Sequence, residues 1–229
     1  MGAKDGKRTK ARNKPAAEDI VLSAHTAGNA DVFPQVLRLH VPPGSVVADV
    51  THGRGVFWRN VPEGLYDLRA TDIATGTDCR DLPYGDGSVD CVVLDPPYME
   101  GLLRPRKARA GSGTHAEFRE RYGPARPAAG PGAPKWHAAV LDLYVAAGRE
   151  ARRVIRPGGA LVVKCQDEVS ANKQWLTHVE IINAYAEMGF YAKDVFVVVR
   201  TNRPHVAGMK KQVHARKNHS YFVVFVKAG

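Results

Sequence analysis

The sequence predicts a single α/β domain built on a doubly wound, mostly parallel β-sheet. Three observations support this fold class. The chain has 229 residues, which is most simply one domain with ample apolar material for one core. Its short apolar runs do not alternate with polar residues, as is typical of strands buried on both faces. Helical patterns separate most of these runs, as the crossovers between parallel strands require.

Six apolar runs are candidate strands, and we expect all six to be buried on both faces of the sheet. Each of the first three ends on or beside an aspartate: Asp49, Asp72 and Asp95. In a parallel sheet of this kind, ligands bind at the carboxyl ends of the strands, near the point where the strand order reverses. The predicted strands are 45–49, 67–71, 89–94, 160–165, 191–199 and 221–226.

Two helical patterns lie between the later strands. Residues 156–159, Arg-Pro-Gly-Gly, end the first pattern and turn the chain into the next strand. We expect both apolar stripes to face the core. The first stripe is Trp136, Val140, Leu143, Ala147 and Val154, and the second is Leu176, Val179, Ile182 and Ala186.

Residues 92–98, V-V-L-D-P-P-Y, carry the strongest chemical signal in the chain. They describe a strand that delivers a carboxylate, Asp95, and an aromatic ring, Tyr98, to its carboxyl end. Pro96 and Pro97 have fixed φ angles and no N–H, so the turn is stiff and nearby carbonyls need partners from outside the sheet. Asp95 and a backbone carbonyl can accept both hydrogens of an exocyclic amine while Tyr98 stacks on the attached base.

A second motif lies upstream in residues 46–55, V-V-A-D-V-T-H-G-R-G. An apolar strand closes on Asp49, and Gly53 and Gly55 let the following turn approach a ligand without interference from a Cβ. The third glycine of a dinucleotide fingerprint is missing because Trp58 stands there, so NAD is not expected. Asp72 follows about twenty residues on, where a carboxylate can bind a ribose diol.

In this order the motifs resemble those of the S-adenosylmethionine-dependent amino-methyltransferases of nucleic acids, from about Val32 to Lys227. The resemblance implies a Rossmann-like, mostly parallel seven-stranded sheet, S-adenosylmethionine as cofactor and no metal. It implies that Asp95, Pro96, Pro97 and Tyr98 form the catalytic motif. It assigns the cofactor to Phe33, Asp49, Gly53, Gly55, Asp72 and Asp78, with Phe33 near the methionine end, Asp72 on the ribose and Asp78 near the adenine. The chain departs from the family at Val50-Thr51, where Pro-Phe is common, and at His52, where Cys is common.

The expected reaction follows from the chemistry of an aryl amine. Its lone pair is delocalised into the ring, and hydrogen bonds accepted by Asp95 and the Pro96 carbonyl push the nitrogen toward a reactive, tetrahedral form. A base inside a duplex cannot reach such a pocket, so the target must be flipped out or already single-stranded. The resemblance favours N6 of adenine in DNA, because relatives with Asp at the first motif position usually act on adenine. RNA adenine or guanine, cytosine N4, and a catalytically silent nucleic-acid-binding module stay open as alternatives.

The charge distribution suggests a nucleic-acid partner. The net charge is +10, but residues 1–17 hold six Lys/Arg against one acid, residues 101–137 eight against two, and residues 200–219 six against none. A basic fringe around an acidic remainder attracts a phosphate backbone. We expect residues 1–17 to be a disordered basic arm and residues 18–229 to be the methyltransferase domain. The basic 101–137 loop is expected to stay mobile until substrate binds and is the candidate for target recognition. The expected contacts are Arg104, Arg106, Lys107, Arg109, Lys210, Lys211, Arg216 and Lys217.

The remaining features are negative. Three cysteines without paired spacing suggest neither a disulfide framework nor a zinc site. No apolar run approaches the roughly 20 residues that a membrane span needs. We therefore expect a cytoplasmic protein with no membrane association. The sequence sets no expectation for the oligomeric state.

Overall fold

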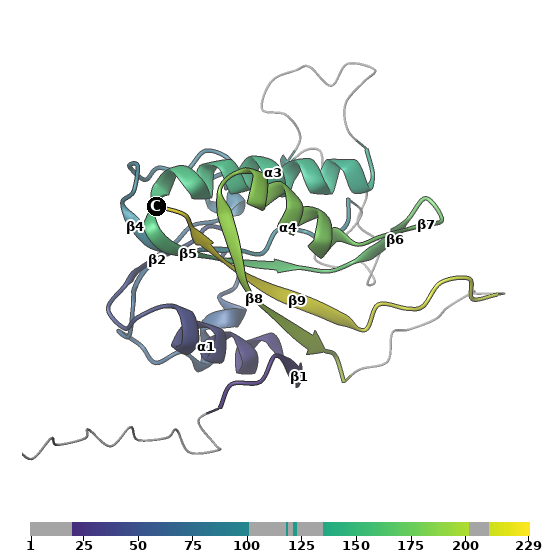
Figure 1. Ribbon diagram of the computed structural model, residues 1–229, viewed down its shortest axis with the longest axis horizontal. Helices are drawn as coiled ribbons and strands as arrows, with labels where there is room; N and C mark the ends of the chain where they lie inside the picture. The colour runs from purple at the N-terminus through teal and green to yellow at the C-terminus, as the bar shows by residue number, and fades with distance from the viewer. Residues whose placement is uncertain (1–19, 101–117, 119–120, 123–134, 202–210) are drawn as a thin grey trace, which may run out of the picture.

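The computed structural model describes residues 20–100, 118, 121–122, 135–201 and 211–229. Within these ranges the chain forms a sheet with helices on both faces (Figure 1). The elements are β1 (Ala24–Thr26), α1 (Asn29–His40), β2 (Val46–Asp49), the 3₁₀ helix η2 (Val56–Asn60), β3 (Asp67–Ala70), the 3₁₀ helix η3 (Ile73–Thr75), β4 (Val89–Leu94), α3 (His137–Val154), β5 (Ile155–Cys165), β6 (Glu168–Ser170), β7 (Lys173–Trp175), α4 (Thr177–Glu187), β8 (Phe190–Val199) and β9 (His219–Lys227).

The main sheet has seven strands in the order β1-β8-β9-β5-β4-β2-β3. β9 runs antiparallel to both of its neighbours, β5 and β8, and all other pairs are parallel. The predicted fold class is therefore confirmed. Because β2 pairs with both β3 and β4, the strand order reverses at β2, and the carboxyl ends of β2 and β4 lie side by side.

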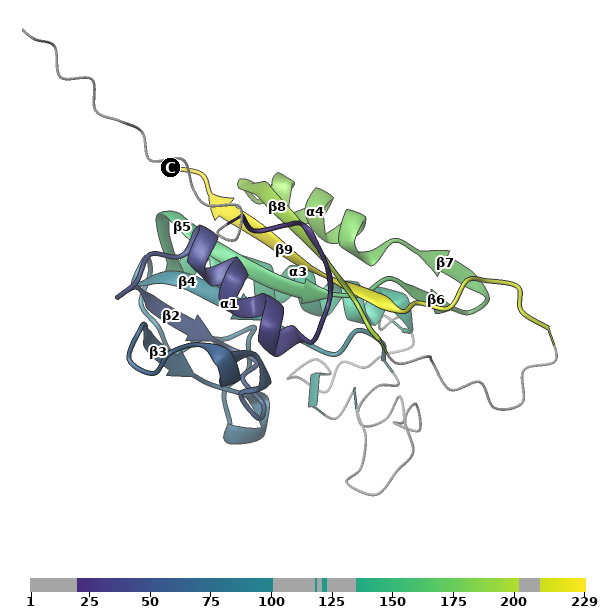
Figure 2. The ribbon, with the colours of Figure 1, turned by 90° about the horizontal axis from the view of Figure 1, so that it is seen from below.

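Two hydrophobic clusters cover the two faces of this sheet. α3 and α4 pack on one face, and α1 with η2 packs on the other (Figures 1 and 2). Tyr144 and Tyr185 are completely buried in the first cluster, and Phe33 and Phe222 in the second. The side chains of β4 alternate between the clusters, since Val92 and Leu94 belong to the first and Cys91 and Val93 to the second.

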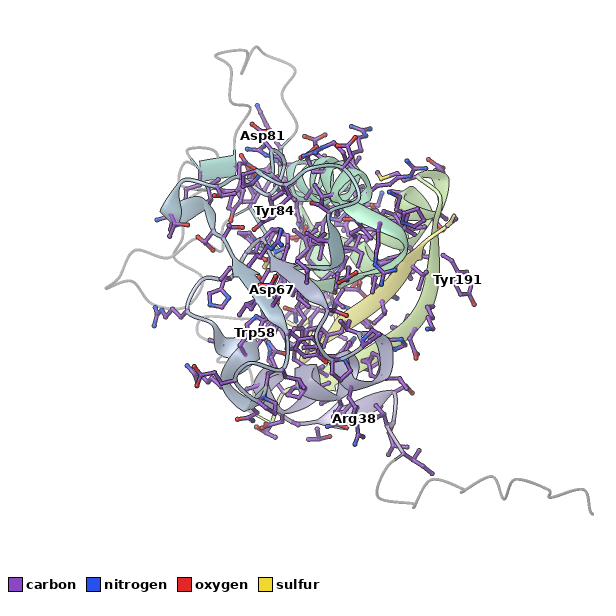
Figure 3. All side chains as sticks on the ribbon, turned by 90° about the vertical axis from the view of Figure 1, so that its left-hand side faces the viewer. Arg38, Trp58, Asp67, Asp81, Tyr84 and Tyr191 are labelled. Atoms are coloured by element: carbon purple, nitrogen blue, oxygen red, sulfur yellow. The ribbon has the colours of Figure 1, made fainter. Side chains whose placement is uncertain are left out.

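The expectation that every strand is buried on both faces is wrong for β3. It is an edge strand, and Asp67, Leu68 and Ala70 are exposed. Figure 3 shows Asp67 on the side of the molecule that faces the viewer and Tyr191 of β8 pointing outward into solvent. A short strand at the edge of a sheet can carry polar side chains because one side has no neighbouring strand.

The chain turns between α3 and the sheet as expected, but the strand begins earlier. Ile155 already pairs with Val89, and the ladder then skips to Ala160 opposite Cys91. Residues 156–159 bulge out between these pairs. Gly159 is required here, because an added Cβ would lie 2.6 Å from the Ile155 side chain and 2.7 Å from the Asp90 carbonyl oxygen.

The predicted stripe on α4 is wrong. Leu176 precedes the helix and Val179 is exposed, whereas the buried face consists of Thr177, Ile181 and Tyr185. Tyr185 is buried because its hydroxyl donates to the carbonyl oxygen of Tyr144, at 2.8 Å. A pattern that counts only apolar side chains as buried would place this tyrosine on the solvent-facing side of the helix. On α3 the stripe is correct from Val140 to Val154, but Trp136 lies before the helix and is half exposed.

The helix α1, the strands β1, β6 and β7, and the two 3₁₀ helices have no counterpart among the predicted elements. Pro34 lies inside α1, and proline normally interrupts a helix. β1 has three residues, and β6 and β7 form a separate hairpin of three residues each.

Of the described helices, none combines the length and the apolar character that crossing a membrane requires. The predicted arm at 1–17 and most of the 101–137 loop lie outside the described residues, and the division at residue 18 stays a prediction.

Candidate active site

The predicted acidic residues meet at the carboxyl edge of the sheet. Asp49 closes β2, Asp95 follows β4 directly, and Asp72 follows β3. The backbone joins these ends, because Val50 N–H donates to the Val93 carbonyl and Thr71 N–H donates to the Asp49 carbonyl. This edge is the reversal point of the strand order, where ligands of such sheets bind.

Asp49 shapes the turn that follows β2. It is 3% exposed, and Oδ2 accepts from Trp58 Nε1 at 2.7 Å and lies 3.1 Å from His52 Nδ1. Oδ1 accepts from Thr51 N–H at 3.2 Å. The hydrogen bond to Asp49 raises the pKa of His52. Trp58, which replaces the third glycine of a dinucleotide motif, therefore helps to fix the carboxylate that begins the loop.

Gly53 and Gly55 both have left-handed backbone angles, with φ of 54° and 64°. An added Cβ at Gly55 would lie 2.9 Å from His52 Nε2, so the turn needs glycine there. Gly53 N–H donates to Asp72 Oδ2 at 3.0 Å. This hydrogen bond ties the loop after β2 to the residue after β3.

Asp72 and Asp78 have different local roles. Asp72 caps η3 by accepting from Ala74 N–H at 2.8 Å, and it remains partly exposed. Asp78 is held by Arg80, whose Nη2 lies 2.6 Å from Oδ2 and whose Nε lies 3.0 Å from Oδ1. Partial burial alone would raise the pKa of Asp78, but the hydrogen bonds and charge of Arg80 outweigh it and lower the pKa.

Phe33 occupies the core. It is completely buried, and its ring lies 5.2 Å from the rings of Phe57 and Trp58 and 5.8 Å from that of Phe222. The structure thus gives Phe33 a packing role behind the loop, and its predicted contact with the cofactor stays a prediction.

The predicted catalytic motif, Asp95-Pro96-Pro97-Tyr98, forms a compact turn. Asp95 N–H donates to Thr51 Oγ1 at 2.6 Å, and the Tyr98 hydroxyl donates to Asp95 Oδ1 at 2.6 Å. Among the residues that the structure describes, no donor reaches Asp95 Oδ2. Burial raises the pKa of Asp95 to about 7. Thr51 thus supports the motif directly, although in the sequence it is only a departure from the family pattern.

A cleft of about 360 Å³ opens beside this turn. It joins the glycine loop to the catalytic motif, so it brings together predicted residues from two motifs. Tyr122 also lines the cleft and is a residue that sequence reasoning missed. Its carbonyl oxygen accepts from Arg80 Nη1 at 2.6 Å. We call this the acidic cleft, lined by Thr51, Gly53, Asp72, Asp95, Pro96, Pro97, Tyr98 and Tyr122.

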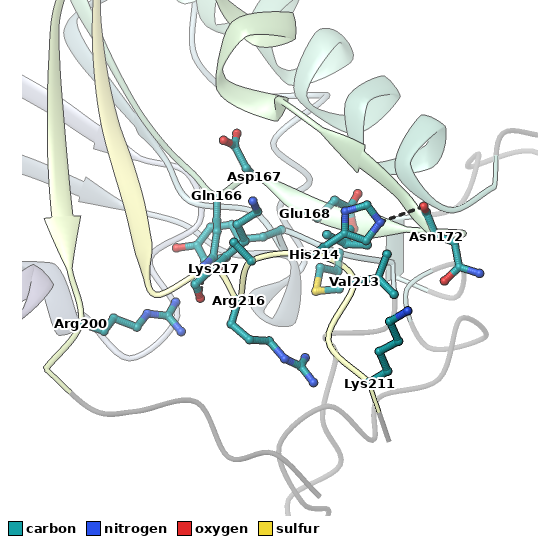
Figure 4. Close-up of a pocket in the computed structure, with 14 residues that line it drawn as sticks. Gln166, Asp167, Glu168, Asn172, Arg200, Lys211, Val213, His214, Arg216 and Lys217 are labelled. Atoms are coloured by element: carbon teal, nitrogen blue, oxygen red, sulfur yellow. Dashed lines mark hydrogen bonds between the residues drawn. The ribbon is translucent and has the colours of Figure 1, made fainter. Parts of the chain in front are cut away.

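Tyr98 also lines a second cleft of about 720 Å³, which Figure 4 shows from close by. Cationic side chains reach it from the end of β8 and from the segment before β9. Its two acids are buried and paired, Asp167 with His178 at 2.7 Å and Glu168 with His137 at 2.8 Å. We call this the basic cleft, and its cationic residues are Arg200, Lys211, Arg216 and Lys217.

Three predicted nucleic-acid contacts, Lys211, Arg216 and Lys217, therefore lie together at one cleft. The other five, Arg104, Arg106, Lys107, Arg109 and Lys210, lie outside the described residues. In the described ranges, no group of three or more His, Cys, Asp or Glu side chains is arranged to hold a metal ion.

Comparison with known proteins supports the fold. No protein-family model and no curated protein sequence matches the chain. Among solved structures, the 1,6-didemethyltoxoflavin-N1-methyltransferase of Burkholderia thailandensis, with bound S-adenosylhomocysteine, is 13% identical, with 88% of this chain and 79% of that chain covered and a TM-score of 0.51. The chain thus has the Rossmann-like fold of S-adenosylmethionine-dependent methyltransferases. At this identity the likeness establishes the fold alone.

Two weaker matches are proteins of Thermus thermophilus. TrmN is 16% identical, with 87% of this chain and 50% of that chain covered and a TM-score of 0.49. A candidate DNA modification methylase is 20% identical, with 66% and 51% covered and a TM-score of 0.39. The present chain spans about half the length of each of these two proteins.

Proposed function

We propose that the protein transfers a methyl group from S-adenosylmethionine to N6 of adenine in DNA, acting on a base flipped out of the duplex. One observation carries the proposal. The Asp95-Pro96-Pro97-Tyr98 turn lies at the reversal point of the sheet, and Tyr98 lines both the acidic cleft and the basic cleft. A methyl donor on one side and a nucleotide on the other would meet at this turn.

The acidic cleft suits the proposed cofactor. Gly53 and Gly55 leave space for close backbone approach, and Asp72 presents a partly exposed carboxylate after β3, where a ribose diol can be bound. Asp78 would lie near the adenine, and Asp49 would hold the loop in place from behind. When bound, S-adenosylmethionine supplies an electrophilic methyl group on its sulfonium. A protein with the same fold binds S-adenosylhomocysteine, and we extend this cofactor class to the present chain as part of the proposal.

The catalytic motif can prepare an amine for attack. Asp95 Oδ2 accepts no hydrogen bond from the described residues, so it is available to one N–H of the target amine. The Pro96 carbonyl would accept from the other N–H, and the Tyr98 ring would stack on the base. A fixed carboxylate at this point stabilises the positive charge that develops on nitrogen.

The basic cleft suits a phosphate backbone. Arg200, Lys211, Arg216 and Lys217 supply cationic groups around the cleft, while its acids Asp167 and Glu168 are buried against His178 and His137. Arg104, Arg106, Lys107, Arg109 and Lys210 would add to this surface. Because phosphate contacts carry no sequence information, this charge supports a nucleic-acid substrate without distinguishing DNA from RNA. The preference for adenine in DNA rests on the family resemblance of the motif.

The test is direct identification of the methylated nucleoside. The protein is incubated with labelled S-adenosylmethionine and with separate DNA and RNA pools, and the modified nucleoside is identified after digestion. We expect label in N6-methyladenine from DNA and none with an Asp95→Ala variant. Label in RNA adenine or guanine, or at cytosine N4, would assign a different substrate to the same methyl-transfer reaction. No transfer to any pool would overturn the proposal.

A further inference from the structure

A buried lysine lies beside the catalytic motif without an ion-pair partner. Lys164 of β5 is 1% exposed. Its Nζ donates to Ser220 Oγ at 2.8 Å and lies 4.0 Å from the centre of the Phe222 ring. Among the described residues, no carboxylate oxygen lies within 4.0 Å of Nζ. Burying an ammonium group without a counter-charge is costly, so this position needs an explanation beyond packing.

The sheet register brings Lys164 next to Asp95. Leu94 of β4 pairs with Val163 of β5, so the next residue on each strand, Asp95 and Lys164, are neighbours at the end of this ladder. Successive side chains of a strand point to opposite faces. Val162 belongs to the cluster on the α1 face, and Lys164, two residues further along the same strand, points to that face against Phe222.

We infer that Lys164 is a positioning residue that keeps Asp95 in its carboxylate form, so that Asp95 can accept a hydrogen bond from the target amine. This rests on the proposed function for the identity of the amine, but the charge relation between the two side chains does not. Lys164 acts through Asp95 and touches neither substrate nor cofactor. Ser220 and Phe222 hold the ammonium group in place.

The charges around the pair agree with this role. Burial raises the pKa of Asp95 to about 7, while the Tyr98 hydroxyl, Lys164 and Arg200 favour its ionised form and Asp49 opposes it. Burial lowers the pKa of Lys164 to about 8, and Asp95 opposes that shift. Each group thus stabilises the charged form of the other. Without Lys164, burial and the charge of Asp49 would favour a protonated Asp95, which can no longer accept at both oxygens.

The test compares three variants by carboxyl ¹³C NMR titration of Asp95 in the full chain. Lys164→Met and Lys164→Gln both remove the charge, and the amide of the second can still bond to Ser220. We expect the titration midpoint of Asp95 to rise by about one pH unit or more in both. Lys227→Met is the matched control, because Lys227 donates to the Ile155 carbonyl at the opposite end of the sheet. An unchanged midpoint in the Lys164 variants, or an equal rise in the control, would overturn the inference.

Thermal unfolding and single-turnover transfer give two further readouts. Removing one member of a buried pair of opposite charges leaves Asp95 less well compensated, so Tm should fall in both Lys164 variants. Transfer by Lys164→Met should fall about tenfold below the shifted midpoint and recover at higher pH. A lower Tm with an unchanged pH profile would make Lys164 structural and overturn the inference. If the wild-type protein methylates no nucleic acid, the proposed function fails, while the NMR titration still decides whether Lys164 controls Asp95.

Discussion

The acidic and basic clefts meet at Tyr98 but are built in different ways. The acidic cleft is formed largely by three strand ends between Asp49 and Tyr98, and its loop is fixed by hydrogen bonds between neighbouring motifs. The basic cleft is twice as large, about 720 Å³ against about 360 Å³. Its lining comes from the turn after β4, the ends of β5 and β8, the β6–β7 hairpin and the segment before β9.

This difference separates two kinds of recognition. A small cleft with fixed glycine and carboxylate geometry suits one invariant ligand, as a cofactor is. A large cleft with long cationic side chains suits a polymer whose backbone must be held in several places. If the two clefts are independent, variants of one cleft should weaken the binding of one ligand and leave the affinity for the other ligand unchanged. Only variants of the shared motif should affect the reaction as a whole.

Asp95→Ala should have the largest effect, because Asp95 belongs to the shared motif. We expect single-turnover methyl transfer to fall by about 10²–10³-fold or more, with affinity for S-adenosylhomocysteine within a few-fold of wild type. Asp95→Asn should be nearly as severe, since a charge-assisted hydrogen bond of about 1.5–3 kcal/mol is lost. Calorimetry and rapid-quench transfer assays measure the two quantities. Near-native transfer by either variant would remove Asp95 from the chemistry.

Replacing Arg200, Lys211, Arg216 and Lys217 together by Ala should have the next largest effect, and among the two ligands it should weaken the binding of DNA alone. Each lost phosphate contact lowers the slope of log affinity against log salt by about 0.9 on duplex DNA. Affinity for S-adenosylhomocysteine should not change. The measurement is DNA affinity as a function of salt concentration. Turnover is not used, because Arg200 also influences the charge of Asp95.

The matched variant replaces Arg104, Arg106, Lys107 and Arg109, which come from the predicted target-recognition loop. A similar loss of salt dependence would mean that both segments contact the backbone. If only this second set changes the slope, the basic cleft is not the path of the nucleic acid. If one of these arginines contacts a base edge, its single replacement should also relax sequence preference, at about 1–3 kcal/mol for the preferred site.

The acidic cleft was predictable from sequence because its parts are local. Asp49, Gly53, Asp72 and Asp95 each follow an apolar run, and their meeting point follows from the topology of parallel strands. The buried Lys164 was not predictable, since a lysine inside an apolar run gives no sign of its neighbour until the β4–β5 register is known.

The stripe on α4 failed for a related reason. Tyr185 and Thr177 carry polar groups but are completely buried. The acceptor for the Tyr185 hydroxyl is the carbonyl oxygen of Tyr144 on α3, 41 residues earlier in the chain. Tyr122 and the basic cleft likewise depend on contacts between distant segments. Sequence patterns therefore predicted the core strands of the sheet and the edge where the acidic residues meet. The remaining features depend on tertiary contacts.

Tyr98 variants should sharpen the comparison, because its ring and hydroxyl face different partners. Tyr98→Ala should weaken capture of the base by about 1–3 kcal/mol. Tyr98→Phe keeps the ring but loses the 2.6 Å hydrogen bond to Asp95 Oδ1. That bond favours ionised Asp95, so its loss should raise the pKa of Asp95 above about 7 and move the acid limb of the pH–rate profile upward.

The direction in which the acid limb moves follows from the role of the Asp95 carboxylate. Transfer needs the carboxylate, so the rate rises with pH through the pKa of Asp95, and a higher pKa reduces the rate at neutral pH. Above the limb, Tyr98→Phe should approach the wild-type rate while Tyr98→Ala should not. A Phe variant as damaged as Ala at every pH would assign the hydroxyl a direct part in the chemistry.

Asp72→Ala should have the smallest effect and should act on the acidic side alone. The carboxylate is assigned to the cofactor ribose, but it also accepts from Gly53 N–H and caps η3, and losing such a cap costs about 0.5–2 kcal/mol. Thr75→Ala is the matched control, because Thr75 Oγ1 donates to the Asp72 carbonyl without touching its carboxylate. Calorimetry with S-adenosylhomocysteine should show weaker binding for Asp72→Ala than for Thr75→Ala, with DNA affinity unchanged in both. Equal losses would make Asp72 a turn residue and leave the ribose contact to another side chain of the acidic cleft.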